Sequence, residues 1–249
     1  HFGLRQNWLS AYFDMMDDLW MSDKLGNRQI QALKVWLKDA EITDNNKITP
    51  LGQKLAEFGA DSLLTWSVIW NNLAYNSTIV RWYVLCVPWK GVYTKDELID
   101  MLGDSYSVST RSNAVTSLFE LLRHSPLGEK LCLGKLEMMG KRNIVKSVYK
   151  MGWENPDPVA ILYSLYRYAE NQNGRYDFTL SELEQSNAVV KGISPISLFG
   201  VSKGVIRRIL LGLAVQHSSY IDVEFSGGLD NIFLREECRS LDVLELNRT

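Results

Sequence analysis

The feature that most constrains the fold is a run of apolar residues between Ser62 and Cys86. The segment SLLTWSVIWNNLAYNSTIVRWYVLC places large apolar side chains on nearly every side of a helix or a pair of helices. Polar residues interrupt the run before it reaches the ~18 uninterrupted apolar residues that suggest a membrane span. We therefore expect a buried core helix with no membrane association, and the rest of the chain must supply the elements that surround it.

Composition is compatible with this expectation. The chain has 249 residues, of which 46% are hydrophobic and 22% charged, so it can bury one sizeable core or several small ones. Cys86, Cys132 and Cys238 lie far apart and form no CxxC pair, which argues against a zinc site and a disulfide framework and predicts a cytoplasmic protein. The net charge of -2 argues weakly against a generic polyanion binder, although a binding footprint needs only local charge. Because the chain opens at His1 without a Met, we expect its natural N-terminus to lie upstream or to be processed.

The segment GNRQIQALKVWLKDAEI predicts an amphipathic helix with an unusual polar side. At ~100° per residue, four polar residues fall within an arc of roughly 60°. These residues are Asn27, Gln31, Lys34 and Lys38, with Arg28 beside them. The opposite side is apolar and consists of Ile30, Ala32, Leu33, Trp36 and Leu37. No acid interrupts the polar arc before Asp39.

The neighbouring sequence favours a DNA-binding role for this helix. An amphipathic helix and a break at Gly26 precede it, and the turn of a short hairpin over Ile42–Ile48 follows it. A helix, a turn, a polar-faced helix and a hairpin together are typical of a winged helix-turn-helix. In that arrangement the amides and cations of the second helix contact base edges and phosphates of double-stranded DNA. The alternative is an ordinary surface helix.

A second stretch repeats this pattern. Thr94 is expected to cap a helix with Glu97 as its capping-box partner, and a polar-faced helix follows after Gly103. The later sequence SPLGEKL also echoes TPLGQKL of the first unit, which predicts an internal repeat. The candidate DNA-contacting residues on the second polar-faced helix are Arg111, Asn113 and Thr116.

A basic run follows this helix. Between Glu129 and Lys150, six basic residues stand against two acidic ones, a local charge of +4. We predict phosphate contacts from three of them, with a solvated face as the alternative reading. The three residues are Lys141, Arg142 and Lys146.

The third instance of the pattern lies near the C-terminus. Ser202 is expected to cap a helix, and a hairpin formed by Tyr220–Phe225 and Asn231–Leu234 is expected to turn at Gly227 and Gly228 as the wing. The candidate DNA-contacting residues at the start of this helix are Lys203, Arg207 and Arg208.

These patterns predict a mainly α-helical fold with small β-hairpins, in which tandem winged helix-turn-helix-like units surround a Trp-rich helical core. The expected divisions are a first winged-helix-like unit over residues 1–58, the Trp-rich connector over 59–91, a second unit over 92–150 and a third over 151–249.

Several segments, taken in order, resemble a known family. They are HFGLRQNWL, KLGNRQIQALKVWLKDAEI, ITPLGQKL, LLTWSVIWNNLAYN and DPVAILYSLYRY. Together they are similar to a bacterial family of uncharacterised domains that accompanies DNA phosphorothioation (sulfur-modification) defence genes, and the functional counterpart is the nickase component of Ssp-type systems. Phe2, Arg5 and Trp8 match the opening motif of this family. That motif also has a His three positions before the Phe, outside this chain, so no catalytic role is carried over to His1.

The resemblance implies a bacterial, antiviral DNA-modification role: the chain would bind DNA, by itself or with sulfur-transfer proteins, and could nick one strand for sulfur insertion. The residues themselves contain no recognisable nuclease motif, so the catalytic residues are unknown. A cofactor is expected only for a nickase, which would need Mg²⁺ or Mn²⁺ held by clustered carboxylates. We interpret Asp14, Asp17 and Asp18 as a solvated helix face rather than a metal site. A winged-helix transcriptional regulator and a protein-interaction scaffold without DNA binding remain as alternatives.

Overall fold

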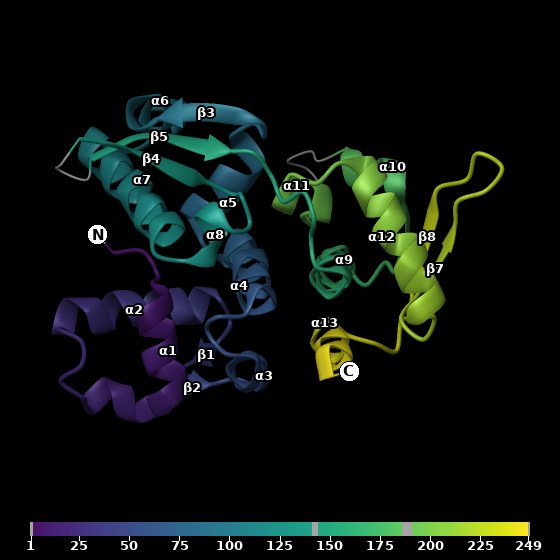
Figure 1. Ribbon diagram of the computed structural model, residues 1–249, viewed down its shortest axis with the longest axis horizontal. Helices are drawn as coiled ribbons and strands as arrows, with labels where there is room; N and C mark the ends of the chain where they lie inside the picture. The colour runs from purple at the N-terminus through teal and green to yellow at the C-terminus, as the bar shows by residue number, and fades with distance from the viewer. Residues whose placement is uncertain (1, 141–143, 186–190, 249) are drawn as a thin grey trace. The chain divides into compact units, whose positions relative to one another are not determined.

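The computed structural model describes residues 2–140, 144–185 and 191–248 (Figure 1). The described residues are mainly helical, with small antiparallel sheets of two or three strands, as the sequence predicts. The chain divides into two compact units, His1–Gly152 and Trp153–Thr249. The finer division into four segments stays a prediction. No helix among the described residues has the length and apolar character to cross a membrane.

The first part of the N-terminal unit contains the predicted amphipathic helix. The elements are α1 (Gln6–Met15), a 3₁₀ helix η1 (Met16–Met21), α2 (Asn27–Asp39), β1 (Thr43–Asp44), β2 (Lys47–Ile48) and α3 (Pro50–Phe58). The β1–β2 hairpin turns at Asn45 and Asn46, which both have positive φ (49° and 62°). This pair of left-handed residues is the geometry of a type I′ turn, and Asn tolerates it well.

The Trp-rich segment forms the core, as predicted. It consists of α4 (Leu63–Asn76) and α5 (Thr78–Cys86). Trp66 and Trp70 are fully buried, and the indole N–H of Trp66 donates to the carbonyl of Ala60 at 2.8 Å. The amide of Asn72 donates to the carbonyl of Ala40, just after α2, at 3.1 Å. The buried helix therefore joins the end of α2 to the core by a hydrogen bond as well as by apolar packing.

A three-stranded sheet completes this unit. Its elements are β3 (Gly91–Thr94), α6 (Lys95–Met101), α7 (Val108–Arg123), α8 (Pro126–Glu129), β4 (Lys135–Met139) and β5 (Ile144–Lys150), with strand order β3-β5-β4. The predicted capping box is present, because Thr94 Oγ1 accepts from the Glu97 N–H and the Glu97 carboxylate accepts from the Thr94 N–H. The basic run between Glu129 and Lys150 therefore includes both strands of a hairpin.

Lys150, the last residue of that run, is completely buried. Its ammonium nitrogen contacts the carbonyl oxygens of Tyr83, Val84 and Val87 at the end of α5 and lies 4.0 Å from the centre of the Trp89 ring. These carbonyls would otherwise lack partners at the helix C-terminus. Burial lowers the pKa of Lys150 to about 6. The side chain is part of the fold and contributes no charge to the surface.

The echo between TPLGQKL and SPLGEKL has a local structural cause. Thr49 and Ser125 each cap the helix that follows, with Pro at its first position. A Cβ on Gly52 would lie 2.3 Å from the Ile42 carbonyl oxygen, and one on Gly128 would lie 2.3 Å from the Leu122 carbonyl oxygen. Both motifs thus begin a helix that passes close to preceding backbone. Their places in the chain differ, because α3 follows its hairpin whereas α8 precedes β4 and β5.

The C-terminal unit has nine elements among its described residues. They are α9 (Pro158–Asn171), β6 (Asp177–Thr179), α10 (Leu180–Glu184), α11 (Pro195–Phe199), α12 (Lys203–Gln216), β7 (Ile221–Glu224), β8 (Asn231–Leu234), α13 (Ser240–Val243) and the 3₁₀ helix η2 (Leu244–Arg248). The expected Ser202 cap and the expected hairpin are both present, with Gly227 and Gly228 at positive φ in the turn.

The two units share a topological order. In the N-terminal unit, α5, β3, α6, α7, β4 and β5 occur in this order, with α8 as an addition between α7 and β4, and the last strand lies in the middle of the sheet. In the C-terminal unit, α9, β6, α10, α12, β7 and β8 follow the same order, with β8 in the middle and α11 as an addition. The repeat between the two units is thus visible in their topology. The echo between TPLGQKL and SPLGEKL does not show it, because both motifs lie in the N-terminal unit.

Candidate nucleic-acid interface

Helix α2 has the exposure that its periodicity predicts. Its apolar residues Ile30, Leu33, Trp36 and Leu37 are buried. Asn27, Arg28, Gln31 and Lys38 are exposed, and Lys34 is half-buried. None of the four exposed side chains has a hydrogen-bond or ion-pair partner within the described part of the chain. Their donors and acceptors are therefore available to a ligand.

The hairpin β1–β2 is attached to α2 through Trp20. The indole N–H of Trp20 donates to the carbonyl of Asn46 at 3.3 Å, and its ring stacks on Tyr12 with centroids 5.1 Å apart. The ammonium of Lys34 lies 4.9 Å from the centre of the same Trp20 ring. This contact withdraws Lys34 from the polar arc, because a cation above an indole is already stabilised. It also fixes the hairpin tip relative to α2.

Acidic residues surround the C-terminal end of α2. A cavity of about 540 Å³ there is lined by Lys38 together with Asp39, Glu41 and Asp44. Burial raises the pKa of Asp39, and the nearby Lys38 opposes this rise. A polyanion would be repelled at this end, so the usable part of the polar arc is its N-terminal half.

The outer face of α7, predicted to contact DNA, is partly covered by the first residues of the chain. A Cβ on Gly3 would lie 2.0 Å from the backbone nitrogen of Leu121, so this segment lies directly on the helix backbone. The hydroxyl of Ser117 and the indole N–H of Trp36 both donate to the carbonyl of Phe2, at 3.4 and 2.8 Å. The N-terminal segment therefore joins α2 to α7.

The motif residues complete this contact. The guanidinium of Arg5 forms an ion pair with Glu120 on α7 at 2.6 Å and lies 5.9 and 5.1 Å from the ring centres of Phe2 and Trp8. Glu120 also faces His124 Nε2 at 3.4 Å. Burial, together with the positive charge of Arg5, lowers the pKa of His124 although Glu120 opposes this shift. The three motif residues thus dock the segment, and His124 ends α7 as its C-cap.

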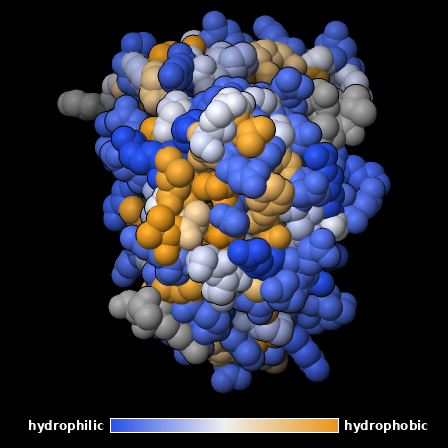
Figure 2. Space-filling model, turned by 90° about the vertical axis from the view of Figure 1, so that its right-hand side faces the viewer, coloured by the Kyte–Doolittle hydropathy of each residue, from blue (hydrophilic) through white to orange (hydrophobic). Residues whose placement is uncertain are grey.

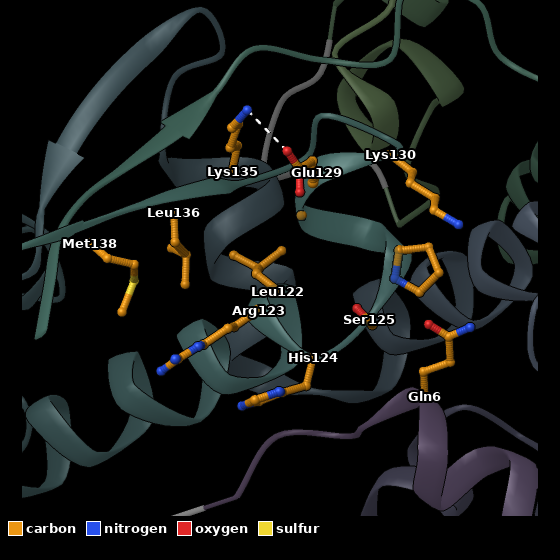
Figure 3. A pocket seen from close by; sticks show the side chains of 12 residues that line it. Gln6, Leu122, Arg123, His124, Ser125, Glu129, Lys130, Lys135, Leu136 and Met138 are labelled. Carbon is orange, nitrogen blue, oxygen red and sulfur yellow. Dashed lines mark ion pairs between the residues drawn. The ribbon is translucent and has the colours of Figure 1, made fainter. Parts of the chain in front are cut away.

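A basic cavity of about 480 Å³ opens beside His124 (Figure 3). Arg123 and His124 come from the end of α7, Lys130 follows α8, and Lys135 comes from β4, where it pairs with Glu129 at 3.0 Å. The walls also include the apolar side chains of Leu122, Leu136 and Met138. Its three cations outnumber its single acid, so the cavity is suited to an anionic group.

The remaining predicted residues of the N-terminal unit have different surroundings. Arg111 is buried and donates to the Ile99 carbonyl at 3.2 Å, while its guanidinium also pairs with Asp104 at 3.3 Å. It thereby connects α6 to α7, and we do not carry it into the candidate surface. Asn113 is half-exposed, and the hydroxyl of Thr116 donates to the Ser112 carbonyl within its own helix.

Lys146 is exposed on β5 and pairs with Glu137 of β4. Their side chains meet at 2.9 Å, and Glu137 also accepts from Ser147 and Tyr149. These bonds lower the pKa of Glu137, and Glu137 in turn raises the pKa of Lys146. Lys141 and Arg142 lie outside the described residues. The predicted phosphate contacts of this run stay a prediction.

In the C-terminal unit, two of the three predicted cations have protein partners. Lys203 pairs with Glu184 at 2.6 Å, and Arg207 donates to the Phe225 carbonyl at 2.6 Å while lying over the Phe225 ring. Arg208 is exposed and has no polar partner among the residues that the structure describes. The same unit also exposes apolar side chains.

Figure 2 shows hydrophobic side chains gathered among hydrophilic ones on the viewed surface. On helix α12, Leu211 and Val215 are exposed.

Three acidic residues near the end of α1 lie on the surface. Asp14, Asp17 and Asp18 are exposed, in keeping with a solvated face. Within the described ranges, no group of three or more His, Cys, Asp or Glu side chains could together hold a metal ion. We assign no chemical step to a metal ion.

No family model and no curated protein matches the sequence. Two crystal structures of SspB, one of them magnesium ion-bound, match the three-dimensional structure with TM-scores of 0.71 and 0.70. The chain has the fold of SspB. The match covers 99% of this chain and 85% of the SspB chains, at 17% and 16% sequence identity. At this identity the likeness to SspB establishes the fold alone.

Sequence reasoning did not find two features of this region. One is the docking of Phe2 and Arg5 on α7, for which the opening motif was the only signal. The other is the basic cavity, whose residues come from α1, α7, α8 and β4 and show no common spacing in the sequence.

Proposed function

We propose that this chain is a DNA-binding component of a bacterial DNA phosphorothioation system of the Ssp type. The SspB fold supports the assignment to this system. The observation that carries DNA binding is the exposed polar arc of α2. Three side chains in its first half, Asn27, Arg28 and Gln31, are exposed and have no partner in the described part of the chain. We also propose that the repeated topological order represents winged helices.

The N-terminal half of α2 is the part that reads DNA. Helix N-termini carry partial positive charge, and recognition helices commonly present their first residues to base edges. The amides of Asn27 and Gln31 can form bidentate pairs with adenine, and Arg28 can bind guanine or phosphate. Lys38 contributes less, because three acids line the cavity beside it.

The basic cavity binds a backbone phosphate in this proposal. Arg123 and Lys130 are exposed at its edge and supply the charge. Neutral His124 can donate a hydrogen bond from its imidazole N–H to a phosphate oxygen. Because phosphate contacts carry no sequence information, this cavity adds affinity without preference.

The experiment compares single variants on matched and scrambled duplexes across a series of salt concentrations. We expect Gln31→Ala to reduce the preference for the matched duplex by about 1–3 kcal/mol while nonspecific binding stays nearly unchanged. Arg28→Ala and Lys130→Ala should each weaken binding and lower the slope of log K against log salt by ~0.9 per lost phosphate contact. Lys191→Ala, an exposed lysine outside every predicted surface, is the matched control and should change neither quantity.

Three outcomes would decide between the alternatives. Salt-independent binding, or none, would overturn the proposal and leave the interaction scaffold. Preference for a promoter-like site with no link to sulfur modification would favour the regulator. Strand nicking is scored in the same duplexes with and without Mg²⁺ or Mn²⁺, and binding without nicking would make the chain a reader that positions another enzyme.

A further inference from the structure

The basic cavity beside His124 has two chemically different kinds of wall. Lys130, just after α8, belongs to the charged part of the lining. Leu136 and Met138 belong to the apolar part, and in Figure 3 both side chains extend from β4 toward the end of α7. Lys130 lies across the cavity from them in the same view. A ligand that fills the cavity must therefore meet a cation and an apolar surface together.

Two cations of the cavity are available to an anion. Arg123 and Lys130 are exposed, and neither side chain has a hydrogen-bond or ion-pair partner within the described ranges. Lys135 differs from them, because it already pairs with Glu129 at 3.0 Å. The hydroxyl of Ser125 is also occupied, since it donates to a backbone carbonyl of α7 at 2.6 Å. The cavity therefore offers an anion strong charge but few free uncharged donors.

The apolar wall is a poor surface for a phosphate oxygen. Leu122 on α7 is 2% exposed, and Leu136 and Met138 are half-buried, yet all three line the cavity. A phosphate diester has two non-bridging oxygens that share its charge. If one of them faces Lys130, the other is turned toward these side chains, where it loses hydrogen bonds to water without gaining a donor. This loss is unfavourable.

Sulfur in place of the second oxygen removes this cost. A phosphorothioate diester keeps the single negative charge of a phosphate diester but has sulfur at one non-bridging position. Sulfur is large, polarizable and a weak hydrogen-bond acceptor, so it loses less than oxygen on leaving water. It also gains dispersion contacts against apolar side chains. A group with one charged oxygen and one sulfur thus matches both kinds of wall.

We propose that the basic cavity binds a DNA phosphorothioate in preference to an ordinary phosphate, with the sulfur against Leu136 and Met138 and the oxygen toward Lys130. This proposal rests on the proposed function and deepens its phosphate contact, because it names the modified backbone as the ligand. The two non-bridging positions of a diester are stereochemically distinct. Only one of the two phosphorothioate diastereomers can therefore place its sulfur on the apolar wall while the strand keeps its direction.

The test measures the affinity of the full chain for duplexes of one sequence. One duplex is unmodified, and the others contain a single phosphorothioate as one pure diastereomer, moved stepwise along each strand. At the contacted position we expect one diastereomer to bind about fourfold tighter than the unmodified duplex, comparable to burying one methylene group. The other diastereomer should bind no tighter than the unmodified duplex.

Four variants separate the sulfur contact from the charge. Met138→Gln keeps the length of the side chain but makes the wall polar, so it should bring the affinity ratio of the two diastereomers toward one. Leu136→Asn is a second polar substitution with the same expectation. Met138→Leu keeps the wall apolar and should retain the ratio. Lys130→Ala should weaken the binding of all duplexes about equally, because all carry the same charge.

The matched control for these variants is Met139→Gln. Met139 is 55% exposed on the same strand and does not line the cavity, so its substitution should retain the ratio. Circular dichroism and thermal unfolding confirm that each variant is folded.

Contrary results are equally specific. Equal affinity for the unmodified duplex and both diastereomers at every position would overturn this inference and leave the DNA-binding function standing. A ratio that survives in both Met138→Gln and Leu136→Asn would overturn the assignment of the sulfur to this cavity. Displacement of the modified duplex by an equal concentration of inorganic thiophosphate would assign the cavity to a free anion. Absence of binding to every duplex would overturn the proposed function itself, and this inference with it.

Discussion

The guanidinium of Arg5 and the carboxylate of Glu120 are 2.6 Å apart although 115 residues separate them in the sequence. Both side chains are mostly buried, with 26% and 23% exposed. The pair holds the first residues of the chain against α7 and brings a positive charge close to His124. It therefore contributes both to stability and to the electrostatics of the basic cavity.

A double-mutant cycle on this pair should reveal substantial coupling. Charged hydrogen bonds contribute about 1.5–3 kcal/mol when mostly buried, so we expect Arg5→Ala and Glu120→Gln to be non-additive by about 1–2 kcal/mol in urea unfolding. The control cycle uses Lys203 and Glu184, which are 39% and 44% exposed. Exposed pairs typically couple by about 0.2–1 kcal/mol. Equal coupling in the two cycles would contradict the structural role of Arg5.

The pKa of His124 should shift in opposite directions in two variants. Its pKa in the folded protein lies below 6.5, because burial and Arg5 outweigh Glu120. Arg5→Ala should raise this pKa and Glu120→Gln should lower it further, as followed by NMR of the imidazole proton. The stability that His124 contributes is complete above pH ~6.5 and is lost as the pH falls through the lower, folded-state pKa. His124→Asn should remove that loss. An unchanged fall in the free energy of unfolding at acidic pH would refute the role given to His124.

Because of Lys150, the free energy of unfolding should rise with pH in the neutral to basic range. Its pKa is about 6 in the folded protein and 10.5 when unfolded, so the unfolded chain binds one more proton between these values. Stability therefore rises with pH in this window, by up to about 1.4 kcal/mol per pH unit. Lys150→Met should flatten the dependence between pH ~6.5 and ~9 in urea titrations. Lys146→Met is the control, because Glu137 raises the pKa of exposed Lys146 and places it above this window.

Two glycines should respond oppositely to alanine. A Cβ on Gly3 would lie 2.0 Å from the Leu121 nitrogen and 2.6 Å from its Cα, so Gly3→Ala must displace backbone and should cost about 2–3 kcal/mol. A Cβ on Gly212 in α12 would meet nothing within 4 Å. Gly212→Ala should therefore stabilise the protein by about 0.5–1 kcal/mol, as expected for a helix interior. Thermal unfolding of both variants measures the difference, and equal effects would contradict the close approach of Gly3.

The sequence predicts those features that depend on local periodicity and capping. The buried side of α2, the Thr94 and Ser202 caps and the turn at Gly227–Gly228 all follow from residues close together in the chain. The apolar run around Trp66 and Trp70 likewise identifies the core, because an all-round apolar helix has nowhere else to lie.

Features that depend on distant segments could not be predicted. Periodicity shows that Ser117 and Glu120 lie outside the buried face of α7, but it does not show that the N-terminal segment covers them. Lys150 belongs to a basic run in sequence, yet the carbonyls at the end of α5 hold it inside the protein. Arg111 is similar, since its partner carbonyl at Ile99 belongs to the preceding helix.

The docking of Phe2 and Gly3 on α7 also orders events during synthesis. The binding surface of this segment is encoded about 115 residues downstream of it. At translation rates of ~5–20 residues per second, the nascent segment waits on the order of ten seconds for its partner helix to emerge from the ribosome. Phe2 and Leu4 have no cover from α7 during that interval, which makes this stretch a natural ligand for chaperones. Phe2 and Gly3 are thus synthesised well before α7 and can reach their final place in the N-terminal unit only after it.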